Sequence, residues 1–140
     1  AIPTISNLLL HPLHQVVRQA LEALENIQSD INLALSNIEN LLMANNQNWK
    51  SPEVFRGWTG QDQVRLNAVS AINSCYKKTK NKSKLESILT KALKDENGYV
   101  AAVACECLLR MNTNSSIKFA LNFLNDRRWD DTLLGGTKVY

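Results

Sequence analysis

The chain has 140 residues, 44% of them hydrophobic, which predicts one domain with enough apolar side chains for a core. Its formal charge of +3 neither requires nor excludes an acidic partner. The sequence has no apolar run of about 18 residues, which excludes a membrane-spanning helix as a predicted element.

Three helices are predicted in the first part of the chain. Residues 4–10 form a short helix, and His11-Pro12-Leu13-His14 is a turn into a helix that runs to about Ile27. Residues 31–44 form the third helix after a break at Ser29-Asp30. The apolar stripe of the second helix comprises Val16, Ala20, Ala23, Leu24 and Ile27, and that of the third comprises Leu33, Leu35, Ile38, Leu41 and Leu42.

Residues 45–60 interrupt this regular pattern and are predicted to be a loop insertion with at most one helical turn. Long loops inside compact domains are usually functional or disordered. Trp49, Phe55 and Trp58 argue against disorder, and we expect them to pack on the end of the adjacent hairpin.

The second half contains four further predicted helical segments, at residues 61–77, 84–94, 97–111 and 116–124. The first two are joined by a basic connection with five lysines, namely Lys77, Lys78, Lys80, Lys82 and Lys84. Asp95 or Asn97 is expected to cap the helix that follows, and Ser115 the last one. Residues 127–134 are predicted to be a short final helix, followed by a tail from 135 to 140.

Similar two-helix units recur along the chain. The spacing of Val100, Ala104 and Cys107-Leu108 matches Val64, Ala68 and Ala71-Ile72, and also Val16, Ala20 and Ala23-Leu24. The first valines of these sets are 48 residues apart (16 to 64) and 36 apart (64 to 100). A period in this range, with two helices per unit, is typical of an α-solenoid.

At these residues the chain resembles HEAT repeats, in particular the short HEAT-like repeats of phycobilisome lyases and bacterial scaffold proteins. The matching segments are LLLHPLHQVVRQALEAL, DQVRLNAVSAI, LKDENGYVAAVACECLL and, in part, FALNFLND. The resemblance implies an all-α, armadillo-like fold, a short right-handed solenoid of three helical hairpins and a terminal half-repeat. The units would span residues 3–28, 30–79, 82–111 and 114–134 within one domain, 1–140.

The resemblance also implies that the second helices of the units line a concave face. The side chains expected to be exposed there are Gln15, Gln19, Glu22, Asp62, Asn67, Ser70 and Glu106. This set is polar and nearly neutral, which suits a protein or peptide partner better than nucleic acid. The candidate partner-binding residues are Trp49, Phe55, Trp58, Gln19, Glu22, Asn67 and Ser70.

Arginines in such repeats form a ladder with aspartates in the turns of adjacent units. Here Arg65 is predicted to reach Asp95 and to set the stacking angle, and a structural role is favoured over ligand binding for both Arg18 and Arg65.

The leading hypothesis is therefore a non-enzymatic interaction or scaffold module, free-standing or part of a larger bacterial protein. Two alternatives remain: a bilin lyase or chromophore-protein chaperone, and nucleic-acid binding through the basic connection.

No catalytic or cofactor motif is identified. His11 and His14 lack the further ligands that a zinc site needs, and the sequence predicts neither a metal nor a cofactor. Cys75, Cys105 and Cys107 have no disulfide-framework spacing and are expected to be core thiols in a reducing cytoplasm.

Overall fold

The computed structural model describes residues 1–51 and 57–126, and the regular structure in these ranges is helical. The elements are α1 (Ile2–Leu8), α2 (His14–Ile27), η1 (Asn32–Ala34), α3 (Leu35–Met43), η2 (Gln47–Trp49), α4 (Gly60–Cys75), α5 (Lys82–Ala92), α6 (Gly98–Met111) and α7 (Asn114–Asp126), where η1 and η2 are short 3₁₀ helices. The all-α prediction is confirmed for these residues. The predicted final helix and the tail lie outside them.

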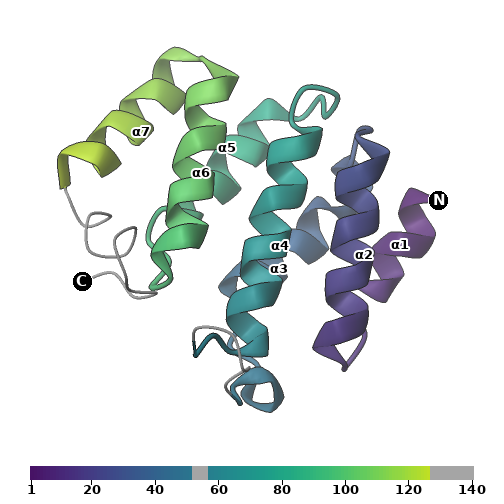
Figure 1. Ribbon diagram of the computed structural model, residues 1–140. Coiled ribbons are helices and arrows are strands. Elements are labelled where there is room, and N and C mark those ends of the chain that lie inside the picture. The colour runs from purple at the N-terminus through teal and green to yellow at the C-terminus, as the bar shows by residue number, and fades with distance from the viewer. Residues whose placement is uncertain (52–56, 127–140) are drawn as a thin grey trace.

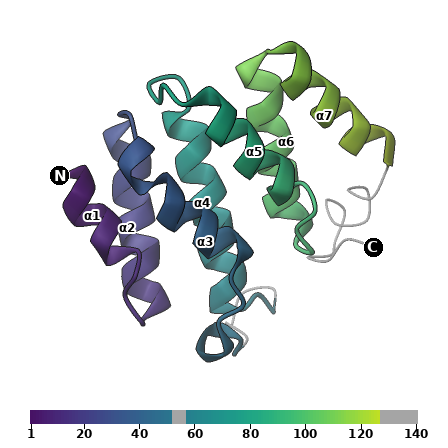
Figure 2. The same ribbon diagram turned by 180° about the vertical axis from the view of Figure 1, so that it is seen from behind.

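The helices form two layers. In Figure 1, α2, α4 and α6 lie side by side in chain order, and α2 packs along α4 as α4 packs along α6. Figure 2, seen from the opposite side, shows the second layer of α1, α3 and α5 in front. Each of these helices contacts the α2, α4 or α6 helix that follows it in the chain. Helix α7 packs against α6 at the end of the molecule opposite α1.

Side-chain caps define where several helices begin. Thr59 accepts from the Asp62 amide while the Asp62 carboxylate accepts from the Thr59 amide, a reciprocal capping box that starts α4. Asn81 caps α5, and Asn97 caps α6 by accepting from Tyr99 and Val100. Each such cap stabilises its helix by about 1 kcal/mol.

The start of α7 differs from the prediction. Thr113 and Ser116 exchange hydrogen bonds, with Ser116 N donating to Thr113 Oγ1 at 3.0 Å and Thr113 N donating to Ser116 Oγ at 2.9 Å. Ser115 is exposed instead. Thr113 takes the capping role because the residue three positions further on is Ser116, whose hydroxyl is buried and can bond back.

The core lies between the two layers and is built from equivalent positions of α2, α4 and α6. The predicted sets on α4 and α6 are fully buried, and the complete burial of a Val, Leu or Ile side chain contributes about 1.5–3 kcal/mol. The small residues Ala68, Ala71, Ala101 and Ala104 are also buried, which allows neighbouring helices to approach closely.

The predicted stripe of α2 is wrong by one residue. Val17, Leu21 and Leu24 are fully buried, whereas Val16 is only partly covered and Ile27 is 41% exposed. Two adjacent valines made both registers possible, and the contact with α4 selects the face that contains Leu21 rather than Ala23. The buried valine of α2 is therefore Val17, which lies 47 residues before the buried Val64 of α4.

The third predicted helix is also shorter and less uniform than expected. It begins as the 3₁₀ helix η1 and becomes α-helical only at Leu35. Leu33 is 69% exposed and does not belong to the core stripe, because the 3₁₀ turn directs it away from the positions occupied by Leu35 and Ile38.

The described parts of the insertion, residues 45–51 and 57–60, pack at one end of the helical layers, as predicted. Trp49 is buried and its indole N–H donates to the carbonyl of Pro12 at 2.8 Å, while Trp58 is buried against the Tyr99 ring at a centroid distance of 5.5 Å. Gln61 fixes the preceding loop by accepting from Asn46 N at 2.6 Å. Phe55 lies outside the described residues.

Candidate interaction surface

The surface of α2, α4 and α6 is centred on α4. Every residue from Gly60 to Cys75 is buried or only partly exposed, because α2 and α6 flank this helix on both sides. Apart from Asp62 in the first turn, whose carboxylate pairs with Arg65, the partly exposed side chains form one helical stripe of Gln63, Leu66, Asn67, Ser70, Asn73 and Ser74. With one leucine among amides and hydroxyls, the stripe offers donors, acceptors and a small apolar contact, but no formal charge.

The predicted face residues lie on this surface. Gln15, Gln19 and Glu22 are exposed on α2, Glu106 is exposed on α6, and Asp62, Asn67 and Ser70 are partly exposed on α4. The structure thus places Gln19, Glu22, Asn67 and Ser70 on adjacent helices of one layer.

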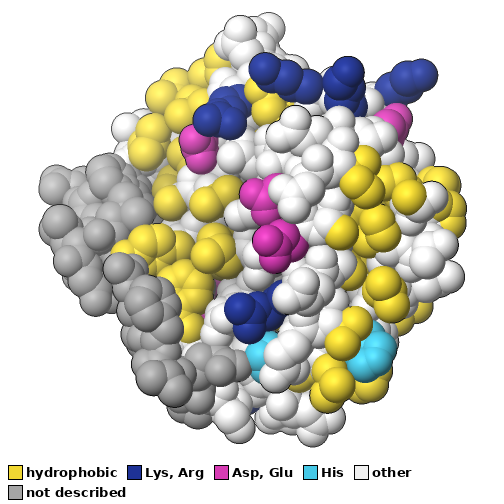
Figure 3. Space-filling view, turned by 45° about the vertical axis from the view of Figure 1, so that its right-hand side comes forward, with side chains coloured by type: hydrophobic (Ala, Val, Ile, Leu, Met, Phe, Trp, Pro, Cys, Tyr) yellow, Lys and Arg dark blue, Asp and Glu magenta, His cyan; other side chains and the backbone are white. Residues whose placement is uncertain are grey.

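Charged side chains border the neutral stripe. Glu22 and Glu25 belong to α2, and Glu106 on α6 pairs with Arg110 at 3.1 Å. In Figure 3, acidic side chains lie towards the middle of the view, most Lys and Arg side chains gather along the upper edge, and a further basic side chain lies below the acidic ones. A partner that crosses this face therefore meets carboxylates beside neutral amides, with most of the basic groups at one edge.

The two described tryptophans do not contribute to this surface. Trp49 and Trp58 are each only 6% exposed, so both belong to the packing of the insertion and neither presents a ring to solvent. Their part in direct partner contact, which the sequence suggested, is not supported by their burial. One indole lies beside the Pro12 carbonyl and the other beside the Tyr99 ring.

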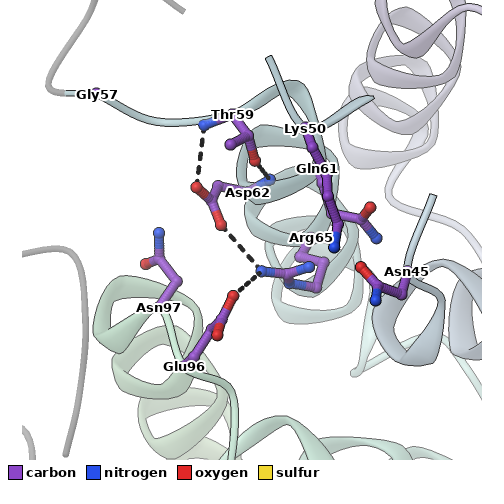
Figure 4. A pocket seen from close by; sticks show the side chains of 9 residues that line it. All are labelled: Asn45, Lys50, Gly57, Thr59, Gln61, Asp62, Arg65, Glu96 and Asn97. Carbon is purple, nitrogen blue, oxygen red and sulfur yellow. Dashed lines mark hydrogen bonds and ion pairs between the residues drawn. The ribbon is translucent and has the colours of Figure 1, made fainter. Parts of the chain in front are cut away.

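The second feature of interest is a buried ion cluster around Arg65. Its Nε lies 2.9 Å from Asp95 Oδ2, and its Nη2 lies 2.9 Å from Asp62 Oδ1 and 3.8 Å from Glu96 Oε1. Figure 4 shows Asp62 and Glu96 converging on the guanidinium from α4 and from the turn before α6. The predicted contact between Arg65 and Asp95 is present, and Asp62 and Glu96 extend it to three carboxylates.

The cluster joins one helical unit to the next at low solvent exposure. The Arg65 side chain is 9% exposed and that of Asp95 is 6% exposed, whereas that of Glu96 is 75% exposed. Burial raises the pKa of Asp95, and the neighbouring Arg65 charge opposes that rise. Arg18 follows Val17 as Arg65 follows Val64, but its Nε–H has no hydrogen-bond acceptor among the residues described.

A hollow of about 290 Å³ opens beside this cluster, between the starts of α4 and α6. Its lining is polar and comprises Asn45, Lys50, Gly57, Thr59, Gln61, Asp62, Arg65, Glu96 and Asn97. Sequence reasoning identified Asn97 only as a capping candidate, although Asp95-Glu96-Asn97 concentrates polar side chains directly after a helix.

Two of the five lysines in the lysine-rich connection make contacts within the protein. Lys82 Nζ donates to the carbonyl of Tyr76 at the end of α4, and Lys84 Nζ lies 2.9 Å from Glu39 Oε1. Lys77, Lys78 and Lys80 are exposed, and their side chains make no ion pair with a described residue. Three of the five lysines are therefore available to an anionic partner.

The cysteines and histidines do not form a reactive or metal-binding group in the described part of the chain. No cluster of three or more His, Cys, Asp or Glu side chains there has metal-binding geometry. All three cysteines are buried and unpaired, and burial raises the pKa of Cys107 to about 12. Within residues 1–51 and 57–126, no helix combines the length and the apolar character that crossing a bilayer demands.

Comparison with protein-family models, with curated proteins and with solved structures gives no match for this chain.

Proposed function

We propose that this protein is a short α-solenoid of HEAT-like units that binds another protein or a peptide through the surface of α2, α4 and α6, without catalysis. The observation that carries the proposal is the stripe along α4, which is neutral, hydrogen-bonding and partly enclosed by two flanking helices. Such a stripe can bond to a main chain and can contact apolar atoms at Leu66 without desolvating a formal charge of its own.

The serial packing of the helices supports the solenoid part of the proposal. Each helix of the α2–α4–α6 layer contacts its own preceding helix and the next member of the layer. The Arg65 cluster then connects α4 to the turn before α6, where a ladder contact would act. Repeat proteins gain their stability from such nearest-neighbour interfaces and present extended surfaces for partners.

The lack of an accessible thiol weighs against the chromophore alternative. A lyase-type role would be favoured by an acidic hollow or by one lined by Cys or Tyr. The hollow beside Arg65 is acidic and Tyr76 lines another, but Cys75, Cys105 and Cys107 are all buried in the core. A further test is direct: mixing the protein with a free bilin and recording the absorbance spectrum should produce no change.

The test of the main proposal uses matched substitutions on the two layers. Asn67→Arg and Ser70→Arg place bulky cations on the α4 stripe, whereas Asn40→Arg and Ser36→Arg make the same changes at exposed positions of α3. Affinity capture from the host, followed by quantitative mass spectrometry, should recover a protein with the wild type and the α3 variants. The α4 variants should lose that protein. Equal recovery by both pairs of variants would exclude this surface.

A second candidate, nucleic-acid binding, is favoured by the exposed Lys77, Lys78 and Lys80. These lysines lie in the connection between α4 and α5, beside the ends of the helices that form the face. If they contact phosphates, a gel shift at low salt should weaken when all three are changed to Gln, and the affinity should fall steeply with salt. A Lys118→Gln variant on α7 is the control, and the absence of any shift would remove this candidate.

A further inference from the structure

The Asn97 side chain holds an unused donor in a buried position. Its Oδ1 accepts from Tyr99 N at 2.9 Å and from Val100 N at 3.4 Å, so the cap fixes which end of the amide is the oxygen. The opposite end, Nδ2, has no hydrogen-bond acceptor among the described residues, and the residue is only 2% exposed. A buried donor without a partner is costly, so an external acceptor would restore a lost interaction.

This donor belongs to the hollow beside the ion cluster. In Figure 4 the Asn97 side chain points from the start of α6 towards Asp62 and Thr59 at the start of α4. The Asp62 carboxylate is already bonded to the Thr59 amide and to Arg65. Because no described residue supplies an acceptor to Asn97 Nδ2, a molecule that enters the hollow can provide one.

The charges around the hollow determine which sign of charge a bound molecule can have. Asp62, Asp95 and Glu96 surround the single guanidinium of Arg65, so the cluster keeps an excess of negative charge even when Lys50 at the rim is counted. Glu96 is the most exposed and the most distant of the three carboxylates from Arg65, at 3.8 Å. It is thus the group best placed to pair with an incoming cation, whereas a phosphate or carboxylate would be repelled.

We propose that this hollow binds a peptide segment with an arginine or lysine side chain. A main-chain carbonyl of the segment accepts from Asn97 Nδ2, and the basic side chain pairs with Glu96. This inference rests on the proposed function, since it assigns the hollow to the same protein or peptide partner that crosses the α4 stripe.

The test is a nuclear magnetic resonance titration of the ¹⁵N-labelled protein with blocked tripeptides. The probes are N-acetylated, C-amidated Gly-Arg-Gly, Gly-Gln-Gly and Gly-Glu-Gly, and the side-chain amide signal of Asn97 is assigned by its loss in Asn97→Ser. The arginine peptide should shift this signal in a saturable manner. The glutamine peptide should bind about tenfold more weakly, and the glutamate peptide should not bind.

Two variants separate binding from folding. Serine is as good a helix cap as asparagine, so Asn97→Ser should keep its melting temperature and lose the peptide. Glu96→Gln should weaken the arginine peptide about tenfold, and the carboxylate-to-amide control Asp126→Asn at an exposed position of α7 should not.

Three results would overturn the site: no saturable shift with the arginine peptide, equal affinity for the arginine and glutamate peptides, or unchanged binding by Asn97→Ser. None of them would affect the α4 surface, because Asn67→Arg and Ser70→Arg report on that surface separately through partner capture.

Discussion

Replacing Arg65 by methionine should destabilise the protein more than any other single change in the ion cluster. Asp62 is partly exposed and Glu96 can turn to solvent, but Asp95 is held at 6% exposure and would keep a buried charge that has lost its guanidinium. Removing one partner of a buried ion pair typically costs about 3–5 kcal/mol. Because Asp95 can take up a proton instead, we expect about 3 kcal/mol for Arg65→Met at neutral pH.

The double variant tests whether the cost comes from this pair. Asp95→Asn alone leaves Arg65 with two carboxylates and should cost about 1–2 kcal/mol, close to the loss of one charge-assisted hydrogen bond. Combining Arg65→Met with Asp95→Asn should then cost less than the sum of the single changes by about 1–3 kcal/mol. Urea unfolding followed by circular dichroism gives these free energies.

The pH dependence of the Arg65→Met cost tests independently whether that cost comes from the ionised Asp95 carboxylate. Burial already raises the pKa of Asp95 above its ordinary value of 3.8, and removing Arg65, which opposes this rise, should raise it further. A raised carboxyl pKa in the folded state means that stability is retained at low pH and lost as the pH rises through that pKa. The deficit of Arg65→Met should therefore shrink as the pH falls towards about 4. A cost below about 0.5 kcal/mol, or strictly additive single changes, would refute this account of the cluster.

Three further predictions follow from individual contacts. Gly60→Ala should destabilise the protein although alanine favours helices, because the new Cβ would lie 2.6 Å from His14 Cδ2; His14→Ala should rescue it in thermal melts. Hydrogen bonds from its two lysine partners lower the pKa of Glu39 from 4.5, so Glu39→Gln should cost up to about 1 kcal/mol at neutral pH. That cost should disappear as the pH falls through the lowered pKa of Glu39, because the wild type loses this stabilisation as Glu39 is protonated; a pH-independent difference in urea unfolding would contradict it. Cys107, with its buried thiol and its pKa of about 12, should react with a thiol reagent only as fast as the protein unfolds, and rapid labelling of the native state would show that the burial is wrong.

The sequence predicted the helices because their signals are local. Apolar spacing within 97–111 and 61–77 is strong enough to place α6 and α4 within two residues at either end, and the turn at Asp95-Glu96-Asn97-Gly98 marks the boundary between α5 and α6. The contact between Arg65 and Asp95 was predicted from the arginine ladder that the HEAT-like resemblance implies, and it is present where α4 packs along α6.

Features that depend on rotation or on distant contacts were not predictable in the same way. Val16 and Val17 fit the apolar pattern almost equally, and only packing against α4 decides between them. Trp49 could equally have been a surface anchor, because its partner Pro12 lies 37 residues away in the chain. The proposed role of Asn97 depends on its Nδ2, the end of the amide that does not cap α6. The spacing of residues in the sequence does not show where that end of the side chain points.

The most direct test of the central proposal is partner capture by wild-type protein and by the paired variants Ser70→Arg and Ser36→Arg. Both substitutions replace serine by arginine, on the stripe of α4 and on the outer surface of α3 respectively. If α2, α4 and α6 form the binding surface, a protein recovered with the wild type and with Ser36→Arg is lost with Ser70→Arg, while all three melt at similar temperatures. Recovery of the same protein in equal amounts by all three would contradict the proposal.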